Sequence, residues 1–308
     1  MISFTINVKN EIASFDSVKN ENMAMLSAII RNSGRIDKDI TITTENSKVA
    51  RRVYTLISDI YNVPVSIIDK NNNFNRNRLY IITVTDNINF ILQDLGIIDE
   101  NNKYLKTVPS YLIDSLEEKR AYLKGIFLAC GSVNDPKTSR YHLEFFIDTP
   151  EEANFVNDLL NEYYLNSKVI PKDKKSMVYI KEAEKIGDFL RMIGANDAVM
   201  YYEDIRIYRD HKNMTNRLNN MEQANIEKII NTSNEQIKDI ELIYEKLGKE
   251  FLDEKTQEAA IYRIKYPESS LQELSEIMTL EIGKPITKSG LNHRMRRIRE
   301  LANKLKGE

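Results

Sequence analysis

The stretch LKGIFLACG at residues 123–131 has the pattern of a short apolar helix that ends at a glycine. A second stretch, LSAIIRNSG at residues 26–34, also ends at a glycine that is followed by a β-like segment. Small residues at Ala28, Gly125 and Ala129 would let two helices approach backbone to backbone, a rule best known from membrane proteins but general in its geometry. We therefore expect the two helices to pair at the centre of a pseudo-two-fold domain.

The segments around these two helices repeat in the same order. After each helix the sequence predicts strands, an amphipathic helix, two further strands and a last helix that ends at Gly96 or Gly194. The sequence LQDLG at 92–96 matches LRMIG at 190–194, at an offset of 98 residues. A tandem duplication explains this repeat. It predicts an α+β domain at residues 1–195, whose halves of about 1–115 and 116–195 each have their own sheet.

The remainder of the chain has a helical pattern. Residues 196–250 contain isoleucines at roughly helical spacing and predict a helical connector. Residues 251–308 predict three helices, of which the second is capped by Ser269 and Ser270 and the third by Thr287. We expect this last region to be an all-α helix-turn-helix domain.

The composition excludes several classes of protein. With 42% hydrophobic and 29% charged residues, the 308-residue chain is typical of a soluble globular protein of one to three domains. The single cysteine, Cys130, rules out an internal disulfide and a cysteine-based zinc site, and it fits a reducing cytoplasm. The sequence predicts no signal peptide and no membrane span. The three histidines show no metal-ligand spacing and no glycine-rich phosphate loop is present, so we expect no metal and no cofactor.

Charge is distributed unevenly. The net charge of the chain is -2, but residues 287–308 contain seven Lys and Arg against two Asp and Glu. This segment therefore carries +5 and the rest of the chain -7. A basic C-terminal segment on an acidic body indicates a polyanionic partner for that segment.

The last predicted helix has the residues that DNA recognition needs. A helix-turn-helix unit presents the N-terminal half of its second helix to the major groove. Ser289, Asn292 and His293 could reach base edges, Arg296 and Arg297 could bind guanine or phosphates, and Lys288 suits a phosphate. The alternative is an ordinary solvated basic face. Further cations could supplement DNA binding from the connector (Arg206, Arg209, Lys212, Arg217), whereas for Arg51 and Arg52 a solvated helix face is expected.

The paired helix-glycine stretches and the duplicated layout resemble the LAGLIDADG homing endonucleases. In that family each central helix carries an acidic residue just before its glycine, and the two acids hold divalent metal for phosphodiester hydrolysis. The corresponding residues here are Ser33 and Cys130, and a hydroxyl and a thiol do not replace two carboxylates at a site for a hard cation. Asp37, Asp39 and Asp135 follow the glycines, where we expect them to form turns. The resemblance thus implies a nuclease-like domain that has lost nuclease chemistry.

The whole chain is similar to the WhiA family of sporulation transcription regulators. The resemblance lies in several motifs: SFT at 3–5, VARR at 49–52, the 123–136 stretch LKGIFLACGSVNDP, FLRMIGA at 189–195, NRL at 216–218, AN at 224–225 and KSGLNHR at 288–294. The family combines a degenerate LAGLIDADG domain with a helix-turn-helix domain similar to that of sigma factors. The last motif adds Arg294 to the expected DNA-binding residues.

The resemblance implies a non-enzymatic, nucleoid-associated transcription regulator that binds double-stranded DNA. Members act in sporulation of filamentous actinobacteria and in cell division and chromosome segregation elsewhere. The acidic N-terminal domain would bind a different partner, such as a protein, or set geometry through the connector. Two alternatives stay open: a LAGLIDADG-type DNA endonuclease with displaced metal ligands, and a protein-binding adaptor whose basic helix docks on an acidic protein surface.

Overall fold

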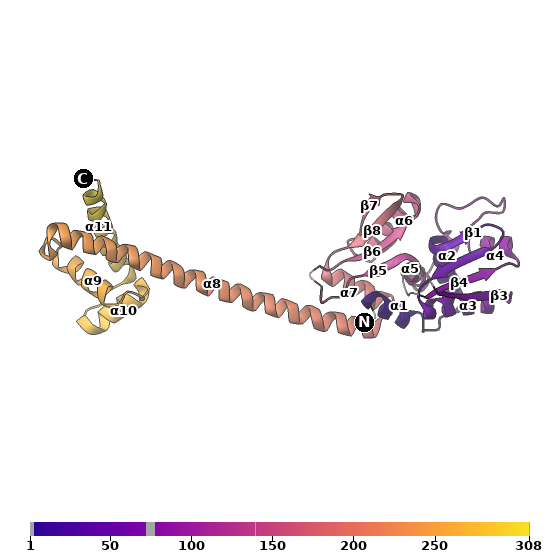
Figure 1. The fold of residues 1–308 in the computed structure, drawn as a ribbon, viewed down its shortest axis with the longest axis horizontal. Coiled ribbons are helices and arrows are strands. Elements are labelled where there is room, and N and C mark those ends of the chain that lie inside the picture. Colours follow the sequence, from indigo (N-terminus) through magenta and orange to yellow (C-terminus); the bar gives the residue numbers. More distant parts are fainter. Residues whose placement is uncertain (1–2, 72–77, 139, 308) are drawn as a thin grey trace. The chain divides into compact units, whose positions relative to one another are not determined.

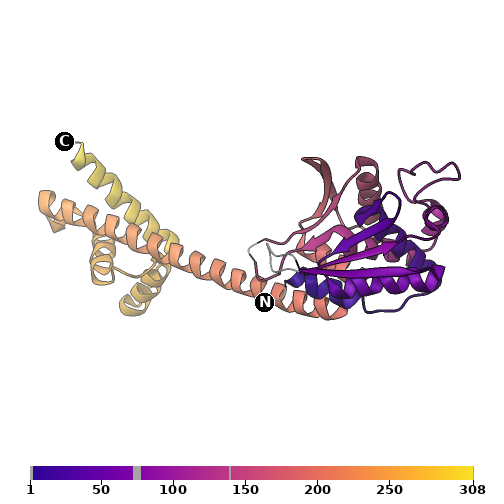
Figure 2. The same ribbon diagram turned by 45° about the vertical axis from the view of Figure 1, so that its right-hand side comes forward.

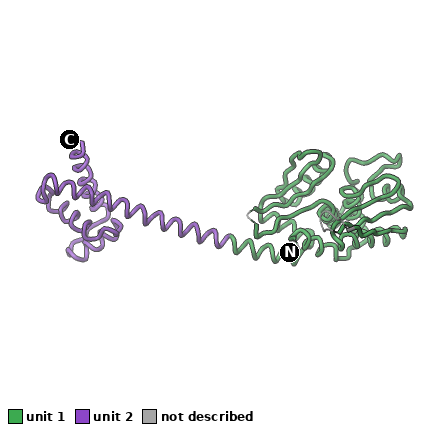
Figure 3. Tube along the Cα trace, in the orientation of Figure 1, with its two compact units in different colours: residues 1–209 green, residues 210–308 purple. Residues whose placement is uncertain are grey.

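The computed structural model describes residues 3–71, 78–138 and 140–307 (Figure 1). By its internal contacts the chain divides into two compact units, residues 1–209 and residues 210–308 (Figure 3). The division falls within one continuous helix, α8 (Asn196–Leu247), so the predicted connector is helical over most of its length.

The first half of unit 1 contains a four-stranded antiparallel sheet with the strand order β1-β2-β4-β3. Alternate residues of its central strands are buried beneath the helices, including Ile40, Ile42, Ile82 and Val84. The elements of this half are α1 (Phe4–Ile12), α2 (Lys19–Ser33), β1 (Gly34–Ile36), β2 (Ile40–Thr44), α3 (Ser47–Tyr61), β3 (Val65–Asn71), β4 (Arg78–Val84) and α4 (Ile88–Asp94).

The second half repeats this arrangement, with the strand order β5-β6-β8-β7. A short 3-10 helix (Ser110–Leu112) precedes it, and a capping box of Ser115 and Glu118 starts its first helix. Its elements are α5 (Leu116–Cys130), β5 (Gly131–Val133), β6 (Leu143–Ile147), α6 (Pro150–Glu162), β7 (Lys168–Lys172), β8 (Lys175–Ile180) and α7 (Ala183–Met192). The identical order of strands confirms the predicted pseudo-two-fold α+β fold.

Helices α2 and α5 pack against each other at the centre of unit 1, with one sheet on either side (Figures 1 and 2). At the crossing, a β-carbon added to Gly125 would overlap the Met25 carbonyl oxygen and lie 2.7 Å from Ala28 Cβ. The expected close approach at Ala28 and Gly125 is therefore confirmed. Ala129, the third small residue, is half-buried.

Both central helices end at a glycine with an extended backbone: φ is -81° at Gly34 and at Gly131. These glycines are not left-handed caps. A β-carbon on Gly34 would lie 2.5 Å from the Ile30 carbonyl oxygen, and one on Gly131 would overlap the Phe127 ring. Glycine is needed because the chain turns directly from helix into strand against its own last helical turn.

One expectation for this unit is wrong. Arg51 is exposed, but Arg52 is buried, because the start of α2 and the segment before it cover that face of α3. Arg52 donates hydrogen bonds to Asp16 Oδ1 at 3.1 Å and to Asn22 Oδ1 at 2.9 Å. It therefore ties α3 to α2 and is not available to a phosphate.

Unit 2 is built from the C-terminal part of α8, a 3-10 turn (Lys249–Phe251) and the helices α9 (Glu254–Lys265), α10 (Leu271–Ile282) and α11 (Lys288–Lys306). The three predicted helices of the C-terminal region are thus present. Apolar residues of all four helices form its own core, including Ile240, Ala260, Met278 and Leu291. This unit has the all-α character expected of a helix-turn-helix domain.

Candidate nucleic-acid interface

The ends of the two central helices lack the acids that a nuclease centre would need. Ser33 Oγ donates to the Ile29 carbonyl at 2.7 Å, and the Cys130 thiol donates to the Ile126 carbonyl at 3.5 Å. Burial raises the pKa of Cys130 to about 12, although the nearby Lys9 acts in the opposite direction. Both side chains therefore satisfy their own helices and offer no anionic ligand.

No group of three or more His, Cys, Asp or Glu side chains in the described part of the chain is placed to hold a metal ion. The acids that follow the glycines act in turns, as expected. Asp39 accepts a hydrogen bond from Thr41, at 3.1 Å, and Asp135 accepts one from the backbone N–H of Lys137, at 2.9 Å.

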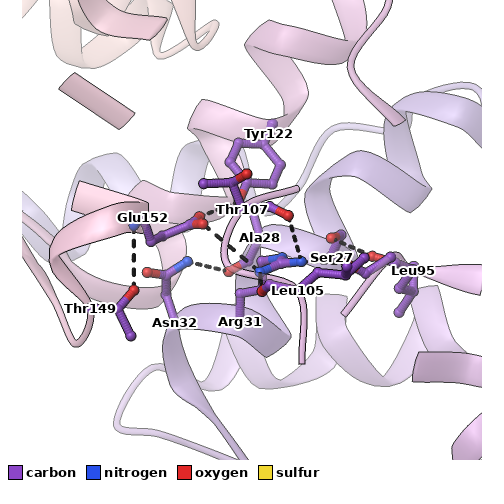
Figure 4. Close-up of polar contacts among 11 residues, drawn as sticks. Ser27, Ala28, Arg31, Asn32, Leu95, Leu105, Thr107, Tyr122, Thr149 and Glu152 are labelled. Carbon is purple, nitrogen blue, oxygen red and sulfur yellow. Dashed lines mark hydrogen bonds and ion pairs between the residues drawn. The ribbon is translucent and has the colours of Figure 1, made fainter. Parts of the chain in front are cut away.

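A buried polar cluster that the sequence did not reveal joins the two halves of unit 1 (Figure 4). The Arg31 guanidinium of α2 donates to the Leu105 carbonyl at 2.9 Å, to the Thr107 carbonyl at 3.1 Å and to the Gly96 carbonyl. Its Nη1 lies 3.9 Å from Glu152 Oε2 of α6, and the two side chains are 8% and 5% exposed. The charges of this pair are therefore almost fully removed from water.

The hydroxyl of Tyr122, on α5, donates to the other oxygen of Glu152. Burial raises the pKa of Glu152, while Tyr122 and Arg31 act to lower it. Arg31 Nε and Glu152 Oε2 are enclosed without a hydrogen-bond partner among the described residues. The cluster lies beside a cavity of about 430 Å³ between α2, β1, the 97–106 segment and the start of α6. Since it connects three helices and a long loop, we assign it a structural role.

In unit 2 the turn between α10 and α11 is held by its own side chains. Gly283 ends α10 in the left-handed region, with φ of 73°. The Thr279 hydroxyl accepts from the Ile286 N–H at 3.0 Å and donates to the Ser275 carbonyl at 2.7 Å. Thr287 Oγ1 caps α11 by accepting from the Gly290 N–H at 3.1 Å. These contacts fix the start of α11 relative to α10.

The apolar stripe of α11 faces the core of unit 2, as its periodicity predicts. Leu291, Met295, Ile298 and Ala302 are buried. Six of the seven residues expected to bind DNA are exposed: Lys288, Ser289, Asn292, His293, Arg296 and Arg297. The seventh, Arg294, is half-buried, and its Nη1 is enclosed without a hydrogen-bond partner in the described part of the chain. The structure therefore brings the first six together on one helix surface and turns Arg294 partly inward.

Acidic side chains of neighbouring helices lie along both flanks of that surface. Arg297 Nη1 is 2.8 Å from Asp253 Oδ1, just before α9, and Arg299 Nη2 is 3.5 Å from Glu235 Oε2 of α8. Asn292 and Arg296 line a cavity of about 250 Å³ between α8 and α11. Sequence reasoning missed these acids because they come from other parts of the chain, Glu235 from α8 and Asp253 from the residue before α9.

Sequence reasoning also missed Arg263 of α9, which is 1% exposed. Its Nη1 donates to the Ser269 carbonyl at 2.7 Å and approaches the Ser233 hydroxyl of α8 at 3.3 Å. This arginine links the turn before α10 to α8 and so stabilises the arrangement of the C-terminal helices.

Two of the connector arginines, Arg206 and Arg209, have partners within unit 1. Arg209 Nη1 donates to the Pro136 carbonyl at 2.7 Å, and its guanidinium lies 4.5 Å from the centre of the Tyr141 ring. Arg206 Nε donates to Glu203 at 2.7 Å. Lys212 and Arg217 are exposed. A supplementary role in DNA binding is therefore better placed on Lys212 and Arg217 than on Arg206 and Arg209.

Comparison with known proteins agrees with this architecture. Family models match residues 19–98 as a WhiA N-terminal LAGLIDADG-like domain, residues 119–212 as a WhiA LAGLIDADG-like domain and residues 215–302 as a WhiA C-terminal HTH domain. The fold and the sequence together define a two-part protein, with a LAGLIDADG-like domain followed by a helix-turn-helix domain.

Relatives similar to the chain over its full length carry the name probable cell division protein WhiA. The one from Bacillus subtilis (strain 168) is 41% identical over 311 residues, which cover 99% of this chain and 98% of that protein. The one from Lactobacillus johnsonii is 40% identical over 315 residues, covering both chains completely. The chain belongs to the WhiA family.

Solved structures show the same fold. The crystal structure of full-length DUF199/WhiA from Thermatoga maritima aligns with a TM-score of 0.59 at 25% identity, covering 98% of this chain and 99% of that one. The N-terminal LAGLIDADG domain of DUF199/WhiA aligns with a TM-score of 0.52 at 23% identity. None of the helices in the described residues is both long and apolar enough to cross a bilayer.

Proposed function

We propose that this protein is a non-enzymatic transcription regulator that binds double-stranded DNA through α11. The observation that supports this most strongly is the surface of α11, where six polar or basic side chains lie exposed on the second helix of a helix-turn-helix domain. Such a surface offers donors to base edges and charge to phosphates. By analogy with relatives named as probable cell division proteins, we propose a role at the nucleoid in cell division. The resemblance to the WhiA family extends this proposal to chromosome segregation.

We propose the following division of the chain. Residues 1–195 form the LAGLIDADG-like body, residues 196–250 the connector and residues 251–308 the DNA-binding domain. The body would bind a protein partner or set geometry through the connector. Genome-wide immunoprecipitation of bound DNA tests the regulatory role, because it returns the target motif together with the genes beside it. Sites scattered without a shared motif would contradict sequence-specific regulation.

Arg296→Ala and Arg297→Ala should each weaken DNA binding. If the arginine contacts a phosphate, the slope of log affinity against log salt should fall by about one unit; if it contacts a base, binding should lose about 1–3 kcal/mol and discrimination at that position. Fluorescence anisotropy at several salt concentrations measures both quantities. Arg51→Ala removes the same charge from an exposed helix of unit 1 and serves as the control. Unchanged affinity in both α11 variants, with the helical circular dichroism intact, would remove this assignment.

The endonuclease alternative makes the opposite prediction for catalysis. Purified protein incubated with Mg²⁺ or Mn²⁺ and a library of DNA duplexes should leave the duplexes intact, because Ser33 and Cys130 hydrogen-bond to their own helices and supply no carboxylate. Sequencing of DNA ends after incubation measures cutting. Reproducible cleavage at one sequence, absent with EDTA, would revive the endonuclease.

The adaptor alternative differs in its dependence on DNA. A basic helix that docks on an acidic protein surface would give no sequence preference in a mobility-shift titration. Titration with a selected and an unrelated duplex at two salt concentrations separates the adaptor from the regulator. Higher salt weakens the phosphate contacts, which do not depend on sequence, so a regulator should still prefer the selected duplex.

A further inference from the structure

The arginines on the exposed surface of α11 are not equivalent. Arg297 is paired with Asp253 at 2.8 Å, whereas Arg296, the residue before it, forms no ion pair within residues 3–71, 78–138 and 140–307. The Arg297 side chain is still 56% exposed. One nitrogen of its guanidinium is therefore held by a carboxylate while much of the group faces solvent.

Asp253 is itself fixed in place. Its Oδ1 accepts a hydrogen bond from Thr256 Oγ1 at 2.7 Å, and Thr256 is 2% exposed. The backbone carbonyl oxygen of Asp253 accepts hydrogen bonds from the backbone N–H groups of Thr256 and Gln257 at the start of α9, both at 2.9 Å. The Thr256 hydrogen bond and then the Arg297 charge hold the pKa of Asp253 below its usual range. The carboxylate is therefore charged at neutral pH and is held at the start of α9.

A carboxylate beside a DNA-binding arginine has two opposed effects. It weakens the attraction of the arginine for phosphate, because the pair carries no net charge. It also restricts the guanidinium to one orientation, and a fixed planar fork of donors suits the two acceptors of guanine in the major groove. Together these effects lower the affinity for any DNA while raising the preference for one sequence.

We propose that Asp253 is a positioning residue. It orients the Arg297 guanidinium toward a base edge and away from phosphates, and in this way it sets sequence specificity. This inference rests on the proposed DNA-binding function and adds the residue that directs one of its contacts. Asp253 need not touch DNA itself. The geometry that supports it is the 2.8 Å pair together with the Thr256 anchor.

Asp253→Asn tests the proposal, because asparagine keeps the shape and can still accept from Thr256 but loses the charge. Glu254→Gln is the matched control: it removes one negative charge from the next residue, which is exposed and has no ion pair within the described part of the chain. The full-length protein is titrated with its selected target duplex and with an unrelated duplex of equal length, each at several salt concentrations.

We expect Asp253→Asn to bind the unrelated duplex several-fold more tightly than Glu254→Gln does, with a salt slope steeper by up to about one unit. The ratio of target to unrelated affinity should fall by about ten-fold. In an Arg297→Ala background the same Asp253→Asn change should leave the ratio unaltered, since the residue it positions is gone.

Two results would overturn the proposal. Equal ratios and slopes for Asp253→Asn and Glu254→Gln would mean that the carboxylate acts only through general charge. A fall in the ratio that persists in the Arg297→Ala background would mean that Asp253 does not act through Arg297. Both results leave DNA binding by the wild-type chain standing, whereas a wild-type chain that binds neither duplex overturns the proposed function and the inference with it.

Discussion

Replacing Gly125 with leucine should lower the free energy of unfolding of unit 1 by about 3 kcal/mol, the upper part of the range for overpacked cores. The reason is that the nearest atom in the way belongs to the backbone of α2, which cannot rotate aside as a flexible side chain can. Even a β-carbon at this position would overlap the carbonyl oxygen of Met25 and crowd Ala28 Cβ, so α2 and α5 would have to move apart. Because β1 and β2 contact α2 while β5 and β6 contact α5, the two halves of unit 1 would move apart with the helices.

Hydrogen exchange followed by mass spectrometry measures this effect in the full chain, because it reads α2 and α5 separately from unit 2. Gly187→Ala is the control. It also adds a β-carbon to a helical glycine of unit 1, but there the nearest atom, at 2.6 Å, is the end of the flexible Glu203 side chain. The control should be nearly neutral or slightly stabilising, since alanine favours helix. Native protection of α2 and α5 in Gly125→Leu would refute the close approach of the two helices.

Arg31→Ala should lower the free energy of unfolding by about 3–5 kcal/mol, the usual result of removing one partner of a buried ion pair. The change leaves the Glu152 carboxylate buried and facing no positive charge. It also leaves the carbonyls of Gly96, Leu105 and Thr107 without their donor. The loop that connects the two halves should therefore lose its anchor along with the ion pair.

Urea unfolding of the full chain followed by circular dichroism, with hydrogen exchange of the 96–107 segment, checks this. Arg51→Ala is again the matched control, because it removes an exposed arginine from the same unit and should change stability by less than about 0.5 kcal/mol. A loss below about 1 kcal/mol in Arg31→Ala, with the loop still protected, would mean that the cluster does not hold the halves together.

These two positions show what the sequence can reveal about this fold. Gly125 could be predicted because helix, small residue and terminal glycine lie within one short stretch that recurs earlier in the chain. Arg31 could not, because its carbonyl partners Leu105 and Thr107 lie 74 and 76 residues away and have no sequence signature. A backbone carbonyl accepts a hydrogen bond whatever its side chain is, so no residue pattern marks it.

The same distinction holds at α11. Helical periodicity separates its buried stripe from its exposed surface, and this made Ser289, His293 and Arg296 predictable. The inward position of Arg294 and the pairing of Arg297 with Asp253 depend on how α9 packs beside α11, and periodicity within one helix does not contain that information. The exposed surface of α11 could be predicted, but the burial and the ion pairing of each of its arginines could not.

The central claim is that a nuclease-like scaffold without its metal-binding acids is joined to a helix-turn-helix domain that reads duplex DNA. The most direct test is a selection: the full-length protein is incubated with a random-sequence duplex library in the presence of Mg²⁺, and bound duplexes are recovered and sequenced. We predict intact duplexes enriched in one motif, and loss of that enrichment in Arg296→Ala. Recovery of cut ends, or of a library no different from the input, would contradict the account.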